Sequence, residues 1–227
     1  MKDFLKKSSL EIVHPKIESY LSDLFVEKDP LHEEMEKFAS QKKFKIGRRS
    51  ISFPIIGKLV GRSIFQLARL TRAKRILELG SGFGYSAYWF ARAIGNEGEL
   101  ILTDGSKENL DQAQSFLSRI PARPEIHYKE GNALDILDEV PGEFDIIFND
   151  INKDQYPAAF RKASPRIRKG GLFIADNVLW SGEVLSPKKA DASAKGIIEF
   201  NRLISQDPSF ISTIIPLRDG LSVSLKI

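Results

Sequence analysis

Three oxygen-bearing side chains follow two apolar stretches of the sequence, at the points where predicted strands end. Asp176 and Asn177 come directly after the run 171–175, and Asp150 follows the run 144–149. Ligands bind at the carboxyl ends of strands in a parallel α/β sheet, and carboxylate and amide oxygens suit a divalent cation. We therefore expect a cation site at these three side chains. Taken singly, either aspartate could instead cap the helix that follows its strand.

A glycine-rich loop, Glu78–Ser86, supplies a second candidate site. Its glycines let the backbone turn sharply and approach a ligand closely. The dinucleotide fingerprint G-x-G-x-x-G would need glycine where this chain has Tyr85, which disfavours NAD. Asp104 ends the next predicted strand, where a carboxylate can accept hydrogen bonds from ribose hydroxyls. We expect a cofactor that contains adenosine. A tight turn without a ligand, with Glu78 as a capping acid, is the alternative interpretation.

Composition sets the class of protein. The 227 residues are long enough for one α/β domain with an appendage, and 42% are hydrophobic and 28% charged. No apolar run approaches the roughly 20 residues of a membrane span, and Met1–Lys7 lacks the pattern of a signal peptide. The chain has no cysteine, which excludes disulfides and thiolate chemistry. We expect a cytoplasmic protein that does not bind membranes.

The net charge of +4 leaves nucleic acid as a possible partner. The densest basic segment is Gln41–Arg49, which contains five lysines and arginines. We interpret it as a solvated linker between helices, and contact with an anionic substrate or RNA is the alternative.

Hydrophobic periodicity predicts a helical appendage followed by alternating strands and helices. Helical spacing begins at Ile12 and again at Pro30, so residues 1–52 form the appendage. The expected strands are 75–79, 99–103, 125–129, 144–149 and 171–175; the expected helices are 57–71, 85–94, 107–120, 133–137, 155–167 and 192–204. This order predicts a doubly wound parallel sheet. The runs 210–216 and 221–227 predict a hairpin that gives the sheet an antiparallel end.

Five motifs in this order resemble one family. They are Glu78–Ser86, Gly131–Leu134, Asp150–Asp154, Asp176–Gly182 and Asp219–Leu221. Together they resemble the cation-dependent S-adenosylmethionine O-methyltransferases, which include catechol and caffeoyl-CoA O-methyltransferases and bacterial relatives. The resemblance runs from about Ile12 to the C-terminus. It implies a single class I methyltransferase domain over residues 1–227, with a Rossmann-like core at 53–227, a seven-stranded sheet whose final strand is reversed, and a homodimer.

The resemblance also implies the cofactor-binding residues. It places the methionine part of S-adenosylmethionine at the glycine loop, the ribose at Asp104, the adenine beside Ala133, and Ile56 over the cofactor. The full expected set is Ile56, Glu78, Gly80, Ser81, Gly82, Ser86, Asp104, Ala133 and Asp150.

The resemblance assigns Mg²⁺ or another divalent cation to Asp150, Asp176 and Asn177, and it makes Asp150 and Lys153 the catalytic residues. A phenol has a pKa of about 10, so a cation that ligates two adjacent hydroxyls would favour the anion. Lys153 would act as the general base, which requires a neutral amine. A surface lysine paired with Asp154 or with a phosphate is the alternative for Lys153.

The expected acceptor is a small phenol, catechol-like or phenylpropanoid-like, in a pocket that includes Asn152, Trp180 and Ser181. The family often has aspartate at position 152, and plant caffeoyl-CoA enzymes have asparagine at position 181, so these departures disfavour an acyl-CoA acceptor. Three alternatives stay open: a tRNA hydroxyuridine O-methyltransferase of the same family, a nicotinamide-dependent oxidoreductase, and a cofactor-binding protein without catalysis.

Overall fold

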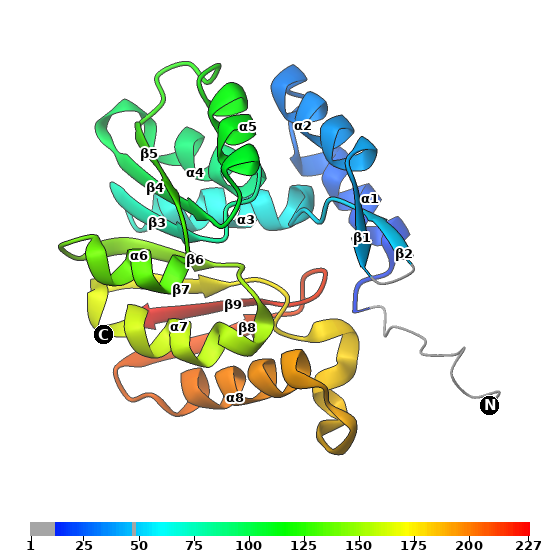
Figure 1. Cartoon of the computed structure of the whole chain (residues 1–227), viewed down its shortest axis with the longest axis vertical. Helices are drawn as coiled ribbons and strands as arrows, with labels where there is room; N and C mark the ends of the chain where they lie inside the picture. Colours follow the sequence, from blue (N-terminus) through cyan, green and yellow to red (C-terminus); the bar gives the residue numbers. More distant parts are fainter. Residues whose placement is uncertain (1–11, 47–48) are drawn as a thin grey trace.

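A computed structural model of the chain describes residues 12–46 and 49–227. Its main sheet has seven strands in the order β5-β4-β3-β6-β7-β9-β8 (Figure 1). The bounds are β3 Arg75–Leu79, β4 Glu99–Asp104, β5 Glu125–Glu130, β6 Phe144–Asn149, β7 Ile167–Ala175, β8 Phe210–Ile215 and β9 Leu221–Lys226. Pairing from β5 through to β7 is parallel, whereas β9 runs antiparallel to both β7 and β8. The doubly wound sheet with a reversed final strand is therefore confirmed.

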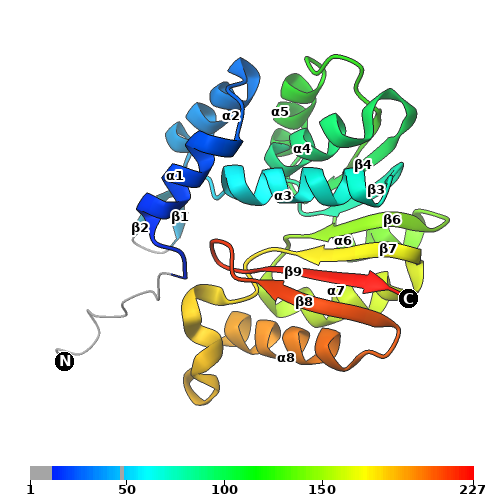
Figure 2. The same ribbon diagram turned by 180° about the vertical axis from the view of Figure 1, so that it is seen from behind.

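Helices cover both faces of the sheet (Figures 1 and 2). One face carries α3 (Gly57–Leu70), α4 (Tyr85–Ile94) and α5 (Lys107–Leu117), and the other carries α6 (Ala133–Glu139), α7 (Tyr156–Ala163) and α8 (Ala192–Gln206). Because they are covered on both sides, the central strands are apolar along most of their length, and four of the five residues of β3 are buried.

The chain order of the strands reverses between β3 and β6, which are neighbours in the sheet. From β3 the chain winds outward to β4 and β5, and from β6 it winds the other way to β7. The loops after β3 and β6 therefore diverge at the carboxyl edge of the sheet, and this divergence opens a crevice. The glycine loop follows β3, and Asp150 follows β6.

The N-terminal appendage consists of α1 (Pro15–Phe25), α2 (Pro30–Gln41) and a hairpin of β1 (Lys43–Ile46) with β2 (Arg49–Ser52). The interpretation of the basic segment as a linker between helices is wrong, because its described residues form antiparallel strands. Its charged and apolar residues alternate with a period of two, the pattern of a strand. Residues 1–11 and 47–48 lie outside the described chain.

Several helix ends also differ from those predicted. α7 ends at Ala163, because Pro165 follows and a 3₁₀ helix (η4, Ser164–Arg166) takes its place, and β7 begins four residues earlier than predicted. α5 ends at Leu117 instead of continuing to Ile120. The other 3₁₀ helices of the described residues are η2 Gly95–Glu97, η3 Lys153–Gln155, η5 Trp180–Leu185 and η6 Pro187–Lys189. Within the described ranges, none of the helices has the length and apolar character needed to cross a membrane.

Close packing of α3 on α4 yields a first prediction. A Cβ atom added at Gly61 would lie 2.1 Å from Nε1 of Trp89, so Gly61→Ala forces the two helices apart. We expect a loss of about 1–3 kcal/mol in the free energy of unfolding, measured by urea denaturation. In a Trp89→Ala background, which removes the ring, the same change should cost much less. An equal cost in both backgrounds would show that this contact does not set the helix spacing.

Candidate active site

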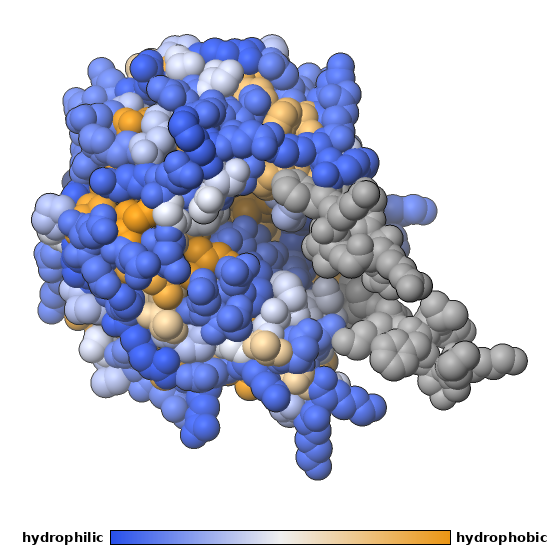
Figure 3. All heavy atoms as spheres, viewed as in Figure 1, coloured by the Kyte–Doolittle hydropathy of each residue, from blue (hydrophilic) through white to orange (hydrophobic). Residues whose placement is uncertain are grey.

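A cavity of about 760 Å³ lies at the carboxyl edge of the sheet, where β3 and β6 diverge. Figure 3 shows a hollow on this side of a mostly hydrophilic surface, with apolar side chains in and beside it. The wall consists of residues 53–56, 80–83, 85–86, 103–105, 131–133 and 150–155, together with Asn177, Trp180 and Ser193. Segments far apart in the sequence therefore share one cavity.

The glycine loop forms one side of this cavity. Gly80 has φ +84°, and a Cβ there would lie 2.7 Å from the backbone oxygen of Asp150. Only glycine gives both the backbone conformation and the close approach of the two loops. The amides of Gly80 and Ser81 donate to the carbonyl of Thr103, at 3.1 and 2.8 Å, so the loop is anchored to the end of β4.

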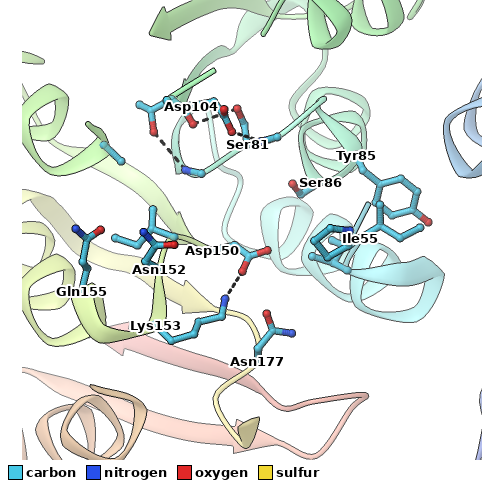
Figure 4. A pocket seen from close by; sticks show the side chains of 18 of the residues that line it. Ile55, Ser81, Tyr85, Ser86, Asp104, Asp150, Asn152, Lys153, Gln155 and Asn177 are labelled. Atoms are coloured by element: carbon cyan, nitrogen blue, oxygen red, sulfur yellow. Dashed lines mark hydrogen bonds and ion pairs between the residues drawn. The ribbon is translucent and has the colours of Figure 1, made fainter. Parts of the chain in front are cut away.

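Asp104 braces the same loop from β4. Its carboxylate accepts hydrogen bonds from the amides of Gly82, at 2.9 Å, and Ser106, at 2.8 Å, and from the side chain of Asn109, at 3.1 Å. Figure 4 shows Asp104 in the cavity wall beside Ser81. The carboxylate is fixed by these amides and half-buried, so it can accept further hydrogen bonds from a ligand that enters the cavity.

Glu78 lies beneath the loop instead of lining the cavity. It is fully buried, its Oε1 accepts a hydrogen bond from Ser86, and its Oε2 has no partner in the described structure. Burial raises the pKa of Glu78 to about 8 against the opposing hydrogen bond from Ser86, and the charges of Asp150 and Asp104 raise it further.

The three side chains of the expected cation site come together at the ends of β6 and β7. Asp150 and Asn177 line the cavity, and Asp176 lies directly behind them at 3% exposure. Oδ2 of Asp176 accepts from the Asn177 amide at 3.2 Å, but its Oδ1 has no partner in the described structure. Burial, followed by the charge of Asp150, raises the pKa of Asp176 to about 7.

This arrangement fits a cation, because a buried carboxylate keeps a free oxygen beside a second carboxylate. Asn177 has φ +60°, a conformation that asparagine tolerates, and its amide faces the cavity (Figure 4). Among the described residues, no group of three or more His, Cys, Asp or Glu side chains is placed to hold a metal. The donor set is thus two carboxylates and one amide.

Lys153 extends from η3 toward Asp150 (Figure 4). Its Nζ lies 2.5 Å from Oδ1 of Asp150 and 2.8 Å from the hydroxyl of Tyr156, and the residue is only 8% exposed. The buried Tyr156 hydroxyl in turn donates to the carbonyl of Asp176 at 2.9 Å. Sequence reasoning missed Tyr156, although its spacing of three from Lys153 on a helical turn was a usable signal.

The acceptor side of the cavity includes Asn152 and Trp180, as expected, and also Gln155 and Ser193, which were not predicted. Ser181 does not line the cavity; its backbone amide donates to Oδ1 of Asp219 at 2.5 Å. Of the expected site residues, the cavity brings together Ile56, Gly80, Ser81, Gly82, Ser86, Asp104, Ala133, Asp150, Asn152, Lys153, Asn177 and Trp180. Glu78 and Asp176 are buried and do not line the cavity, and Ser181 is exposed outside it.

The buried acids predict a pH dependence of stability. Between about pH 4.5 and 8 the folded chain keeps a proton on Glu78 that the unfolded chain releases, so the free energy of unfolding falls as pH rises through this window. One fully linked proton gives about 1.4 kcal/mol per pH unit. Asp176 contributes with the same sign between about pH 3.8 and 7.

Denaturation in urea at a series of pH values across this range measures the slope of the free energy of unfolding against pH. Glu78→Gln should reduce the slope, most clearly between about pH 7 and 8, whereas Glu130→Gln, at an exposed site, should leave it unchanged. Because Asp176 contributes only below about pH 7, a slope between about pH 7 and 8 that is undiminished in Glu78→Gln would contradict the assignment of the buried proton to Glu78.

Relatives of known class match most of the chain. A family model described as O-methyltransferase matches residues 28–227. The catechol O-methyltransferase of Niastella koreensis is 33% identical over 174 residues, which cover 73% of this chain and 79% of that protein. Caffeoyl-CoA O-methyltransferase 1 of Eucalyptus globulus is 29% identical over 178 residues, 74% of this chain and 72% of that protein.

Solved structures of O-methyltransferases also match the chain. The O-methyltransferase TomG from Streptomyces achromogenes, in complex with SAM, has a TM-score of 0.79 and 28% identity, covering 93% of this chain and 96% of TomG. The O-methyltransferase from Bacillus cereus, in complex with SAH, has a TM-score of 0.78 and 27% identity, covering 93% and 97%. These matches favour a methyltransferase over a nicotinamide oxidoreductase. The chain belongs to the family of S-adenosylmethionine-dependent O-methyltransferases that includes the catechol and caffeoyl-CoA enzymes.

Proposed function

We propose that this enzyme transfers the methyl group of S-adenosylmethionine to a hydroxyl of a small catechol-like or phenylpropanoid-like acceptor, with a divalent cation such as Mg²⁺. S-adenosylhomocysteine, the methyl ether and a proton are the products. The observation that carries the proposal is the shared cavity, in which Asp150, Asn177 and Lys153 face the glycine loop. The names of the catechol and caffeoyl-CoA relatives support an acceptor of this class.

The glycine loop and the segments beside it would hold the cofactor. Gly80, Ser81, Gly82 and Ser86 line the cavity on one side, and Ile56 and Ala133 line it elsewhere. The carboxylate of Asp104 is already oriented by backbone amides and would accept the ribose hydroxyls. Glu78 would orient Ser86 from beneath the loop, because the Ser86 hydroxyl donates a hydrogen bond to Glu78 and Ser86 lines the cavity.

Asp150, Asp176 and Asn177 would hold the cation. The free Oδ1 of Asp176 and the repulsion between the two carboxylates are what a cation would relieve. A bound divalent cation lowers the pKa of a hydroxyl that it ligates.

Lys153 would take the proton of the acceptor hydroxyl on Nζ when its amine is neutral. Tyr156 holds the Lys153 amine within the cavity, because its hydroxyl oxygen accepts at 2.8 Å. Asn152 and Trp180 would orient the acceptor ring, and Ser181 would act through its backbone bond to Asp219.

A hydroxylated uridine in tRNA is the second candidate acceptor. The β1–β2 hairpin carries Lys43, Lys45 and Arg49, and it leads through Phe53 directly into the cavity wall. A basic hairpin at this position suits a phosphate backbone. Bulk tRNA is therefore one of the acceptors to be tested for methyl transfer.

Methyl transfer from labelled S-adenosylmethionine to a panel of vicinal diphenols and to bulk tRNA, with and without chelator, tests the function. We expect transfer to a diphenol that chelator abolishes, and Asp150→Ala or Asp176→Ala should remove the response to added cation. Lys153→Ala should lower kcat by about 10²-fold or more, with little change in cofactor affinity. The control is Lys162→Ala, whose lysine pairs with Asp138 outside the cavity wall. Full activity in chelator, or in Lys153→Ala, would refute the corresponding role.

We also propose that the enzyme is a homodimer that uses α1. No residue of α1 is buried, and Ile17, Tyr20, Leu24 and Phe25 are 52–60% exposed on this short helix. Exposed apolar side chains at helical spacing are typical of a protein interface.

Light scattering after size exclusion tests the dimer. Leu24→Lys together with Phe25→Lys should give a monomer, because the two charges would otherwise be buried in the interface. Ser19→Lys on the opposite side of α1 should remain dimeric. A wild-type monomer, or a dimer that survives both lysines, would contradict the use of α1.

A further inference from the structure

The turn between β8 and β9, residues 217–220, contacts the loop that follows β7. The amides of Val178 and Leu179 donate to the carbonyls of Gly220, at 3.1 Å, and Asp219, at 2.9 Å. The side chain of Asp219 accepts from the amide of Ser181. A Cβ added at Gly220 would lie 2.6 Å from the Leu179 side chain, so the two segments are in close contact. The loop 177–182, which carries Asn177 and Trp180, therefore rests on this turn.

Arg218 extends from the same turn to a second segment of the cavity wall. Its Nη1 donates to the carbonyl of Ile55 at 2.7 Å, and its Nε lies 3.4 Å from Oε1 of Glu18 in α1. Gly57 leaves room for the guanidinium, since a Cβ there would lie 2.3 Å from Nη1. Ile55 and Ile56 line the cavity on the side where the cofactor is expected.

One residue thus connects two walls that come from distant parts of the chain. Ile55 and Arg218 are 163 positions apart, and Arg218 is the residue directly before the Asp219 that holds the loop 177–182. Arg218 itself has φ +50°, a strained conformation for an arginine, and its bonds to Ile55 and Glu18 oppose relaxation of the turn. A shift of residues 55–57 would therefore displace the turn and the loop that rests on it.

We propose that Arg218 is a positioning residue that couples cofactor binding at residues 53–57 to the order of the loop 177–182, where the acceptor and the cation would bind. The inference rests on the proposed cofactor contact at Ile56. Cofactor that packs against Ile56 restrains the Ile55 carbonyl, the carbonyl restrains the guanidinium, and the turn then holds the loop in place. If cofactor binding orders the loop 177–182 in this way, the backbone amides of the loop become protected from hydrogen exchange.

Hydrogen exchange by mass spectrometry, with and without S-adenosylhomocysteine, tests this coupling in the full chain. In wild type we expect protection on binding at residues 53–57, at the glycine loop 80–86, and also at 177–182. In Arg218→Gln the protection at 80–86 should remain, whereas the protection at 177–182 should be lost. Arg218→Lys, which keeps one donor for the Ile55 carbonyl, should restore part of it, and Glu18→Gln should weaken it by less than Arg218→Gln does.

Arg166→Gln is the matched control. Arg166 also donates to backbone carbonyls, those of Leu137, Val140 and Gly142, but it lies outside the cavity wall. Arg166→Gln should lower thermal stability without changing the protection from hydrogen exchange at 177–182. If Arg218→Gln retains that protection, or if Arg166→Gln loses it equally, the proposal is overturned. Absence of protection at 80–86 in wild type would overturn the cofactor site, and this proposal with it.

Discussion

The ion pair of Lys153 with Asp150, beside the buried Asp176, is the interaction on which the active site depends. Two carboxylates at the ends of adjacent parallel strands repel each other, and their burial raises the pKa of Asp176 to about 7. Lys153 Nζ, at 2.5 Å from Asp150, compensates part of this charge, and the guanidinium of Arg218 also lowers the pKa of Asp176. The position of η3, which begins at Lys153, therefore influences how far the charge of the two acids is compensated.

Two features of the scaffold hold η3 in that position. Tyr156 is fully buried, accepts from Lys153 and donates to the Asp176 carbonyl, so one hydroxyl links the lysine to the strand end that carries the second acid. Gly196 lets α8 approach closely, because a Cβ there would lie 2.4 Å from the carbonyl oxygen of Lys153. A larger residue at position 196 would push η3, and with it the Lys153 amine, away from α8. A glycine in the interior of α8 thus serves the site despite its cost to the helix.

The parts of the site that sequence reasoning predicted are those set by local chain order. A glycine loop after a strand, and acids at the ends of three strands, reach one edge of a parallel sheet by topology alone, as Gly80, Asp104 and Asp150 do. The features that sequence reasoning missed depend on contacts between distant segments. They are the hydrogen bond from Arg218 to Ile55 and the packing of Gly196 on η3. The hairpin at Lys43–Ser52 was missed for a different reason, since charge density outweighed a clear period of two.

The two buried acids, Glu78 and Asp176, share one feature: within the described residues, only one oxygen of each carboxyl accepts a hydrogen bond. Glu78 lies under the glycine loop and Asp176 lies directly before the loop 177–182, and in the described structure each keeps an oxygen without a hydrogen bond. Burial raises the pKa of both carboxyls and the charge of Asp150 raises it further, so both hold a proton to higher pH than ordinary acids do. Such groups destabilise a fold unless a ligand compensates them. A sulfonium near the first and a divalent cation near the second would each bring positive charge to the site. Buried acids at these positions are suited to the two cationic ligands proposed for the site, and binding of those ligands would then stabilise the folded chain.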